Sequence, residues 1–468
     1  MHKFKSKLLK YQKAAVEKLK DLNTACLFLE PGLGKTITAI SIANEWMQKK
    51  ECNSILIFTK KHLVQTWNTE FKSHTFIKPI LPSTKNGSLR YSFFPNNSVH
   101  ILHYQAGFKH LQIIKFIVLK YKIGVILDEC QVIKNKDSRI TDTIKQISRF
   151  ATKRLIMSGT PIANRPFDLI SQLAILGQNL KGTPSRKATL DIPRNDIRNN
   201  FSRLELNINS IKNKLEKISF TYTKRQLEED GLIVKKNEKL LLLELNKNQR
   251  RIYNQQLPSN SELANTSQKN RRSWIVKTII KLCKVCSGLD QTRTKKEFTE
   301  KEKILIKEAI KAKAKNESFI VWTFFIKTAD NIFETLNRFH VFKIHGKIPQ
   351  NKRDAIISEF KSTPRSVLVA TMQSCKEGLN LQNATKCFFH DLSFRLDDML
   401  QAQDRIHRIN QKKPVSVTYM VYKNTIEEWI YKLYQLKKHF SIDIFNNSKK
   451  LNDEFIFSSS NSLRGYLR

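Results

Sequence analysis

Two adjacent carboxylates, Asp128 and Glu129, directly follow the apolar run VIL at 125–127. A buried strand that ends on two negative charges needs a positive partner, because an unpaired buried charge is costly. A magnesium ion can supply that charge, while a carboxylate beside it orients and deprotonates a water. The pair therefore predicts a site in which Asp128 binds Mg²⁺ and Glu129 acts as the base. An ordinary acidic pair on the surface is the alternative, and the preceding apolar strand argues against it.

A glycine-containing loop, EPGLGKT at 30–36, lies between another apolar run and a helical pattern. Glycines let backbone N–H groups approach a phosphate, and the start of the helix adds positive potential. Lys35 can reach the β- and γ-phosphates of ATP, and the Thr36 hydroxyl can bind Mg²⁺. The strict motif has glycine where this chain has Leu29, so a chance glycine turn is the alternative. The predicted ATP-binding residues of this loop are Gly32, Leu33, Gly34, Lys35 and Thr36.

The stretch RLIMSGTP at 154–161 is a strand that ends in two small hydroxyl residues, Ser158 and Thr160. Such a strand end can hydrogen-bond both a neighbouring carboxylate site and a second lobe. On its own this is an ordinary turn.

The stretch QAQDRIHRINQKKP at 401–414 carries Arg405 and Arg408 three residues apart. That spacing predicts two guanidinium groups on one face of a helix. Two guanidinium groups presented together suit a γ-phosphate whose negative charge grows in the transition state. A basic helix face without catalytic role is the alternative, and it carries weight in so basic a chain.

Apolar strand-like runs alternate with helical patterns on both sides of a polar, Pro- and Gly-containing stretch at 178–240. This alternation is typical of parallel sheets with helices on both faces. Residues 240–315 read as helical and rich in lysine, and 425–440 as an amphipathic helix. The runs expected to be strands are 25–30, 53–59, 98–104, 122–130, 153–161, 319–325, 339–346, 366–372, 386–394 and 414–421. The fold class is therefore α/β with two sheets, which suits a length of 468 residues.

The chain is strongly basic, with 83 Lys and Arg against 41 Asp and Glu and a formal net charge of +42. So large an excess repels itself unless it meets a polyanion. Nucleic acid is the expected partner, because phosphate neutralisation releases counterions and drives binding. An anionic membrane surface is a weaker alternative, and a coding bias toward Lys and Asn would also raise the charge.

Seven cysteines are scattered along the chain, and only Cys283 and Cys286 form a CxxC pair. Without a second pair at zinc-finger spacing we expect no structural zinc, and both cysteines read as helix interior. Unpaired thiols predict a reduced, intracellular compartment, with the nucleus and a host cytoplasm both open. The basic N-terminus has no apolar segment behind it, so no secretory signal is expected. Three lysines interrupt the most apolar region, 111–127, so no membrane span is expected.

The order of these motifs resembles the Swi2/Snf2-like ATPases of helicase superfamily 2 over roughly residues 8–445. LLKYQ, EPGLGKT, ILIFTKKHLVQTWNTEF, LDECQVIKNKDS and LIMSGTPIANRPFDL match the first half of that family in order. IHGKIPQNKRDAIISEF, VLVATMQSCKEGLNL and QAQDRIHRINQKKPV match its second half. The resemblance implies two tandem RecA-like lobes with helical insertions: lobe 1 at 1–238, lobe 2 at 239–445 and a flexible tail at 446–468.

The same resemblance implies roles for single residues. Gln12 would contact the adenine of ATP, and Arg405 and Arg408 would be arginine fingers. ATP binding would close the lobes, and hydrolysis would release them, so that the chain steps along double-stranded DNA. The residues implied in coupling and DNA contact are Gln131, Ser158, Thr160, Gly378 and Gln401.

Two departures from the family pattern stand out: Cys130 and Gln131 replace the usual Ala and His, and Cys375 and Lys376 replace a glycine pair. The lean, Lys- and Asn-rich chain is similar to the nucleoside triphosphatases of cytoplasmic DNA viruses and linear plasmids, which act with transcription machinery; a link to transcription or replication machinery is therefore expected. Two alternative functions are a strand-separating DNA or RNA helicase and a non-catalytic nucleic-acid-binding protein with a decayed motor.

Overall fold

A computed structural model divides the chain into two compact units, Met1–Leu227 and Glu228–Arg468. Each unit contains one six-stranded sheet in which every strand is parallel to its neighbours. The structure describes residues 4–81, 84–85, 88–89, 98–133, 138–159, 175–177, 213, 215–258, 268–289, 298–375, 380–409 and 411–446. The predicted α/β fold with two sheets is confirmed.

The sheet of the first unit has the order β5-β2-β6-β7-β1-β8. Its strands are β1 (Thr24–Leu29), β2 (Ser54–Thr59), β5 (Ser98–His103), β6 (Ile123–Leu127), β7 (Lys153–Met157) and β8 (Ser219–Tyr222). A separate pair of short strands, β3 (Thr84–Lys85) and β4 (Ser88–Leu89), is antiparallel. Every residue of β2 and β6 is buried, because helices cover both faces of a parallel sheet.

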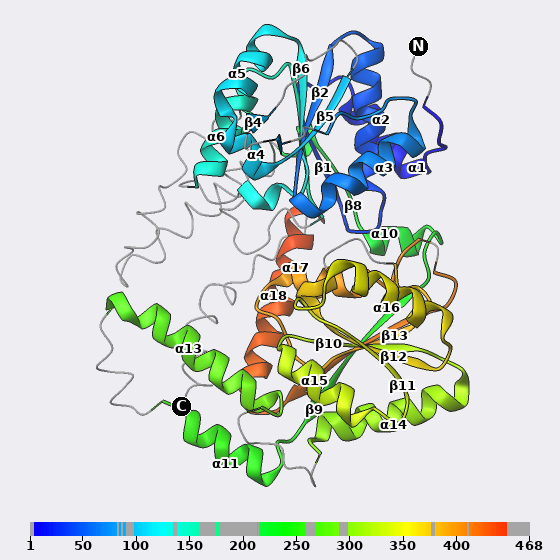
Figure 1. Ribbon diagram of the computed structural model, residues 1–468, viewed down its shortest axis with the longest axis vertical. Helices are drawn as coiled ribbons and strands as arrows, with labels where there is room; N and C mark the ends of the chain where they lie inside the picture. Colours follow the sequence, from blue (N-terminus) through cyan, green and yellow to red (C-terminus); the bar gives the residue numbers. More distant parts are fainter. Residues whose placement is uncertain are drawn as a thin grey trace. The chain divides into compact units, whose positions relative to one another are not determined.

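The helices of the first unit lie on the two sides of the sheet (Figure 1): α1, α2 and α3 on one side, and α4, α5 and α6 on the other. Their bounds are α1 (Lys10–Leu19), α2 (Lys35–Gln48), α3 (Val64–His74), α4 (Tyr104–Lys109), α5 (Leu111–Lys120) and α6 (Arg139–Ser148). Helix α10 (Lys224–Glu229) contains the point at which the chain passes from the first unit to the second. Two 3₁₀ turns, η1 (Lys61–Leu63) and η2 (Cys130–Ile133), follow β2 and β6. The loops after the parallel strands therefore meet at one edge of the sheet, where ligands bind in such folds.

The sheet of the second unit has the order β11-β12-β10-β13-β14-β9. Its strands are β9 (Lys236–Leu243), β10 (Phe319–Thr323), β11 (His340–Ile344), β12 (Ser366–Thr371), β13 (Lys386–Phe389) and β14 (Val415–Tyr422). Its helices are α11 (Lys247–Gln256), α13 (Gln268–Cys286), α14 (Glu300–Lys315), α15 (Ile326–Thr335), α16 (Gln350–Ser362), α17 (Leu396–Gln403) and α18 (Ile426–Asn446), with a 3₁₀ turn η4 (Met372–Cys375).

Two apolar clusters, one on each face, hold helices against this second sheet. One cluster joins the sheet to α13, α16, α17 and α18, and the other joins it to α14 and α15. Cys283 and Cys286 are buried in the first cluster, on α13, which confirms their predicted place inside a helix. A capping box between Thr299 and Glu302 fixes the start of α14.

The domain boundary predicted after residue 238 falls inside β9, and the units divide between Leu227 and Glu228 instead. The physical reason is that β9 pairs with β14 along its whole length, from Lys236 opposite Val415 to Leu243 opposite Tyr422. β9 and β8 were both missed as strands, since 178–240 read as a linker and 240–315 as helical. The predicted tail lies outside the described residues except for Asn446, which ends α18.

Within the described ranges, none of the helices combines the length and apolar character that crossing a membrane requires.

Candidate active site

The phosphate-loop candidate at 30–36 connects β1 to α2. Gly32 and Gly34 have φ angles of 89° and 74°, a region that glycine adopts without strain. A Cβ atom on Gly34 would clash with Nε2 of Gln12, so the loop needs glycine there for space as well. Lys35 is the first residue of the 14-residue helix α2, and its Nζ donates to the carbonyl of Leu29 at 2.9 Å. The predicted strand–loop–helix context is confirmed.

Helix α1 is bonded to this loop through Tyr11 and Gln12. The Tyr11 hydroxyl and the Gln12 Nε2 donate to the carbonyl oxygen of Leu33 at 2.8 and 3.2 Å. The Tyr11 ring stacks on Tyr222 with 4.5 Å between ring centroids, and burial raises the pKa of Tyr11 to about 12. Gln12 is therefore placed against the loop, as its predicted role requires, while adenine contact stays a prediction.

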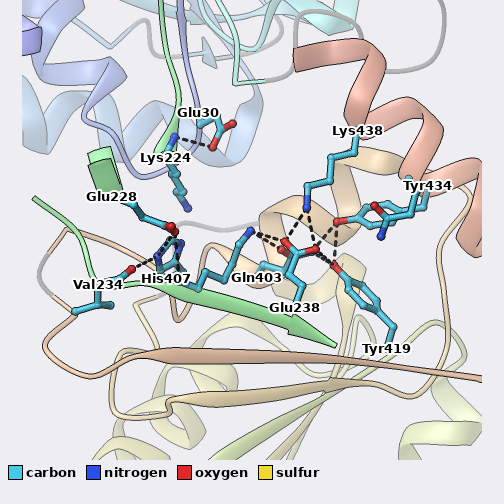
Figure 2. A network of polar contacts seen from close by, with 12 residues as sticks. Glu30, Lys224, Glu228, Val234, Glu238, Gln403, His407, Tyr419, Tyr434 and Lys438 are labelled. Carbon is cyan, nitrogen blue, oxygen red and sulfur yellow. Dashed lines mark hydrogen bonds and ion pairs between the residues drawn. The ribbon is translucent and has the colours of Figure 1, made fainter. Parts of the chain in front are cut away.

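The loop is also tied to the end of β8. The backbone N–H of Glu30 donates to the carbonyl of Tyr222 at 3.3 Å. The backbone N–H of Lys224 donates to Glu30 Oε2 at 3.1 Å (Figure 2). These bonds join Glu30, at the start of the loop, to the end of β8 and to the start of α10.

Asp128 is buried at the end of β6 and is held by three other segments. Its Oδ2 accepts hydrogen bonds from the Thr59 hydroxyl and from Trp67 Nε1, both at 2.8 Å. The Tyr104 hydroxyl donates to the Asp128 backbone carbonyl at 2.6 Å. Burial, together with the neighbouring charge of Glu129, raises the pKa of Asp128 to about 6. A buried carboxylate in this state would be stabilised by a cation.

Glu129 contacts several polar side chains that are connected to one another. Its backbone φ is 51°, which is uncommon for a residue other than glycine. Its Oε2 forms an ion pair with Lys60 Nζ at 3.2 Å and accepts a hydrogen bond from Gln131 Nε2. The Ser158 hydroxyl in turn donates to Gln131 Oε1 at 2.8 Å. Burial acts to raise the pKa of Glu129, but Lys60, Lys35 and Gln131 outweigh it and hold that pKa below its usual value.

The structure thus brings Glu129, Gln131 and Ser158 into one hydrogen-bonded chain. The turn after β7 also approaches the phosphate loop, because a Cβ atom on Gly159 would lie 2.7 Å from Pro31 Cδ and 3.0 Å from Lys35 Nζ. Thr160 lies outside the described residues. The sequence analysis missed Lys60 and the donors to Asp128. Their signal was that β2 ends at Thr59, directly before Lys60, at the same sheet edge.

The residues present fit Mg²⁺ bound together with a nucleotide. No cluster of three or more His, Cys, Asp or Glu side chains suited to a metal occurs in the described part of the chain. Mg²⁺ does not require one, because it commonly keeps waters and takes one or two carboxylates plus substrate phosphates. Asp128, with its raised pKa, and the Thr36 hydroxyl at the start of α2 are the groups suited to hold it.

In the second unit, the predicted helix under Arg405 and Arg408 is wrong. α17 ends at Gln403, and the backbone tightens into i→i+3 bonds, with Arg405 N donating to Ala402 O at 3.3 Å. The carbonyl of Arg405 instead accepts from Leu381 N at 3.0 Å, which takes it out of the helical ladder. Gln401 lies on α17, half-buried, and Gly378 lies outside the described residues.

The arginine pair is largely shielded from water. Arg405 is buried, and Arg408 is half-buried with its Nε donating to the carbonyl of Asp404 at 2.9 Å. Burial, together with the charge of Arg405, lowers the pKa of Arg408 to about 10. The charge of Asp404 acts in the opposite direction, and a phosphate anion would add to its effect.

A buried polar network, the Gln403 network, fixes the segment that precedes this turn (Figure 2). Gln403 Nε2 donates to the hydroxyls of Tyr419 and Tyr434 at 2.6 and 2.9 Å, and its Oε1 accepts from Lys236 Nζ at 3.1 Å. Glu238 forms ion pairs with Lys236 and Lys438, both at 2.7 Å. The network therefore joins α17 to β9, β14 and α18.

Glu238 brings a carboxylate into the Gln403 network, where Figure 2 shows it bonded to Lys438, and it also pairs with Lys236. Its burial acts to raise the pKa, but Lys236 and Lys438 outweigh burial and lower the pKa of Glu238 to about 2. Within the turn, His407 is buried and its Nε2 lies 2.7 Å from the carbonyl of Val234. Sequence reasoning missed this network, since its members are distant in sequence and none belongs to an acidic or glycine motif.

Two family models match the chain. The SNF2-related domain matches residues 11–291, more than half of the chain, and the helicase conserved C-terminal domain matches residues 300–410. These two matches cover both units.

Several curated proteins are similar over most of the chain. An uncharacterized ATP-dependent helicase of Mycoplasma genitalium is 28% identical over 90% of this chain and 40% of its own length. The human SWI/SNF-related matrix-associated actin-dependent regulator of chromatin subfamily A member 1 is 22% identical over 87% of this chain and 40% of its own length. The chain thus spans about two fifths of the length of these relatives.

A solved structure, the Sulfolobus solfataricus SWI2/SNF2 ATPase core in complex with dsDNA, aligns over 99% of this chain and 97% of its own, with a TM-score of 0.44 and 21% identity. The family match rests on the domain models and on the motif residues located above. The chain belongs to the SNF2-related domain family.

Proposed function

We propose that this chain is a DNA-dependent ATPase that uses ATP hydrolysis to translocate along double-stranded DNA. The observation that carries the proposal is the chain of contacts Lys60–Glu129–Gln131–Ser158 beside buried Asp128, with the phosphate loop at the same sheet edge. The names of the mycoplasma relatives, ATP-dependent helicases, agree with it.

Each residue has a defined task in this proposal. The N–H groups of the loop at 32–36 and the Lys35 ammonium bind the phosphates of ATP. Glu129 accepts a proton from the water that attacks the γ-phosphorus, which frees the oxygen's electron pair for the new P–O bond as the bond to ADP breaks. Mg²⁺, held by Asp128 and the Thr36 hydroxyl, would neutralise charge on the phosphates.

Arg405 and Arg408 are assigned the role of stabilising the extra negative charge of the transferring phosphoryl group. The burial of Arg405 and the lowered pKa of Arg408 support that role, because an incoming anion would stabilise both charges. Gln131 and Ser158 are assigned to coupling, since their hydrogen bonds connect the base to the end of β7.

Nucleic acid is the proposed partner because of the net charge of +42. The preference for duplex DNA rests on the order of motifs that the chain shares with Swi2/Snf2-like ATPases and on its membership of the SNF2-related family. Work beside transcription or replication machinery, and an intracellular location, remain proposals from the sequence.

The test is ATP hydrolysis by the full chain without nucleic acid and with duplex DNA, single-stranded DNA and RNA, using Lys35→Ala as the inactive control. We expect strong stimulation by duplex DNA that the control loses. Stimulation only by single strands or RNA would favour the strand-separating helicase. No hydrolysis with any of the four would overturn the ATPase and favour the non-catalytic binding protein.

A further inference from the structure

The ion pair between Lys60 and Glu129 involves the very group that has to act as a base. Lys60 Nζ lies 3.2 Å from Glu129 Oε2, and Gln131 Nε2 donates to the same oxygen. An ammonium and an amide that bond one oxygen of a carboxylate stabilise its negative charge, which weakens the carboxylate as a base, and they fix the direction in which the side chain points. The contact therefore opposes the reaction for as long as it persists.

The Lys60 side chain is partly exposed, so it can move away from Glu129. It is the first residue after β2, and its side chain keeps 29% of its surface exposed, against 16% for Glu129. Lys61 and His62, which follow it, are exposed, and no carboxylate occurs in the sequence from Ile55 to Thr69. A phosphate group that approaches this loop would meet the exposed Lys61 and would compete with Glu129 for the Lys60 ammonium.

The backbone conformation of Glu129 also indicates that its neighbours hold it in place. Its φ of 51° is a conformation that costs a residue with a Cβ atom about 1 kcal/mol or more. Such a conformation persists only where neighbouring contacts hold it, and the Glu129 side chain is held by Lys60 and Gln131. Loss of the Lys60 contact would remove one of the two contacts that hold this side chain.

We propose that the Lys60–Glu129 ion pair is a brake on ATP hydrolysis, released when nucleic-acid phosphate draws Lys60 away. This inference rests on the proposed function and names how nucleic acid would stimulate it. Two other roles for Lys60 predict different results. If Lys60 positions Glu129 for catalysis, its loss lowers the rate both with and without DNA. If the ion pair is merely solvated, its loss changes neither rate.

The experiment measures ATP hydrolysis of Lys60→Met with no DNA and with saturating duplex DNA. We expect the DNA-free rate to rise roughly 10-fold, because a hydrogen bond to a charged group contributes a factor of this order. The rate at saturating DNA should stay within about twofold of the wild type, so the stimulation ratio falls by about the same 10-fold. Saturating DNA is needed since the loss of a lysine also weakens phosphate binding.

Matched variants separate the possible roles. Lys60→Arg keeps the charge and should keep the wild-type ratio, whereas Lys60→Gln should raise the DNA-free rate as Lys60→Met does and guards against a folding defect in that variant. Lys49→Met removes a lysine from the exposed ion pair with Asp21 and should leave both rates unchanged. An unchanged ratio in Lys60→Met and Lys60→Gln, or a fall of both rates, would overturn the brake. Absence of hydrolysis in the wild type would instead overturn the proposed function.

Discussion

The carboxylate region of the first unit and the arginine turn of the second unit place their functional groups by different means. At the end of β6, predicted residues contact one another, as Ser158 and Gln131 do at 2.8 Å. Arg408, by contrast, bonds a backbone carbonyl, and the segment before it is fixed by Gln403 through residues outside the predicted site. In both regions the motif residues can be predicted from the sequence, whereas the distant residues that hold them cannot.

This difference can be tested first at the arginine itself. Arg408→Ala should lower the rate of DNA-stimulated hydrolysis by about 10³- to 10⁵-fold, the range for an arginine that stabilises a transferring phosphoryl group. ATP binding should be kept, because the phosphate loop lies on the other unit. Steady-state hydrolysis and binding of a fluorescent ATP analogue measure the two effects separately.

The control for that variant is Arg250→Ala, which removes an exposed arginine that bonds the carbonyls of Lys423 and Asn424. Its hydrolysis rate should match the wild type. Hydrolysis by Arg408→Ala within a few-fold of the wild type would remove the finger role.

The supporting network should matter for stability more than for chemistry. Glu238→Gln leaves Lys236 and Lys438, both half-buried, without their shared counter-ion, and the loss of hydrogen bonds to a charged group costs about 1.5–3 kcal/mol. The thermal midpoint of the full chain should fall at pH 7, together with the hydrolysis rate, while ATP binding should not change. Glu300→Gln, at the exposed ion pair with Lys303, is the matched control and should shift the midpoint little.

The same variant predicts a pH dependence. The pKa of Glu238 is about 2 in the folded chain and starts from an ordinary value of 4.5. Because the folded pKa is depressed, its stabilisation is complete above about pH 4.5 and is lost as the pH falls toward about 2. The gap in thermal midpoint between wild type and Glu238→Gln should therefore be constant near neutral pH and close in that acid window. A gap that widens on acidification would contradict the role of Glu238.

The smallest effect is expected from one hydroxyl of the network. Tyr434→Phe removes hydrogen bonds to Gln403 Nε2 and to the Tyr419 hydroxyl, both 2.9 Å long, and should cost about 1 kcal/mol. Tyr431→Phe on the same helix is the control, because its hydroxyl accepts a bond from Gln435 at a half-buried position. Equal shifts of the thermal midpoint in both variants would show that the Gln403 network has no special weight.

Motif reading predicted the central strands and the phosphate loop because their signals are local. β2 and β6 are buried on both faces, so their sequences are continuous apolar runs that end in polar residues. β8 and β9 lie at the edges of their sheets and are only partly buried, with charged residues inside β9, so the same signal is absent. The domain boundary was misplaced for that reason.

At the site, too, the motif residues were predictable from local signals and their distant partners were not. Asp128 and Glu129 are adjacent in sequence, but their partners Thr59, Lys60 and Trp67 are more than 60 residues away. Only the parallel order of β2 and β6 brings these segments to one sheet edge. The helix expected under Arg405 was wrong because a long-range bond to Leu381 takes the carbonyl of Arg405, which periodicity does not reveal.

In the proposed reaction Asp128 holds the metal ion and Glu129 is the base. This assignment is tested most directly by Glu129→Gln, measured for ATP binding and for hydrolysis with saturating duplex DNA. Loss of a general base should lower the rate by about 10²- to 10⁴-fold. ATP binding should remain close to that of the wild type, because Asp128 and the phosphate loop are unchanged. Hydrolysis by Glu129→Gln at the wild-type rate would exclude Glu129 as the base.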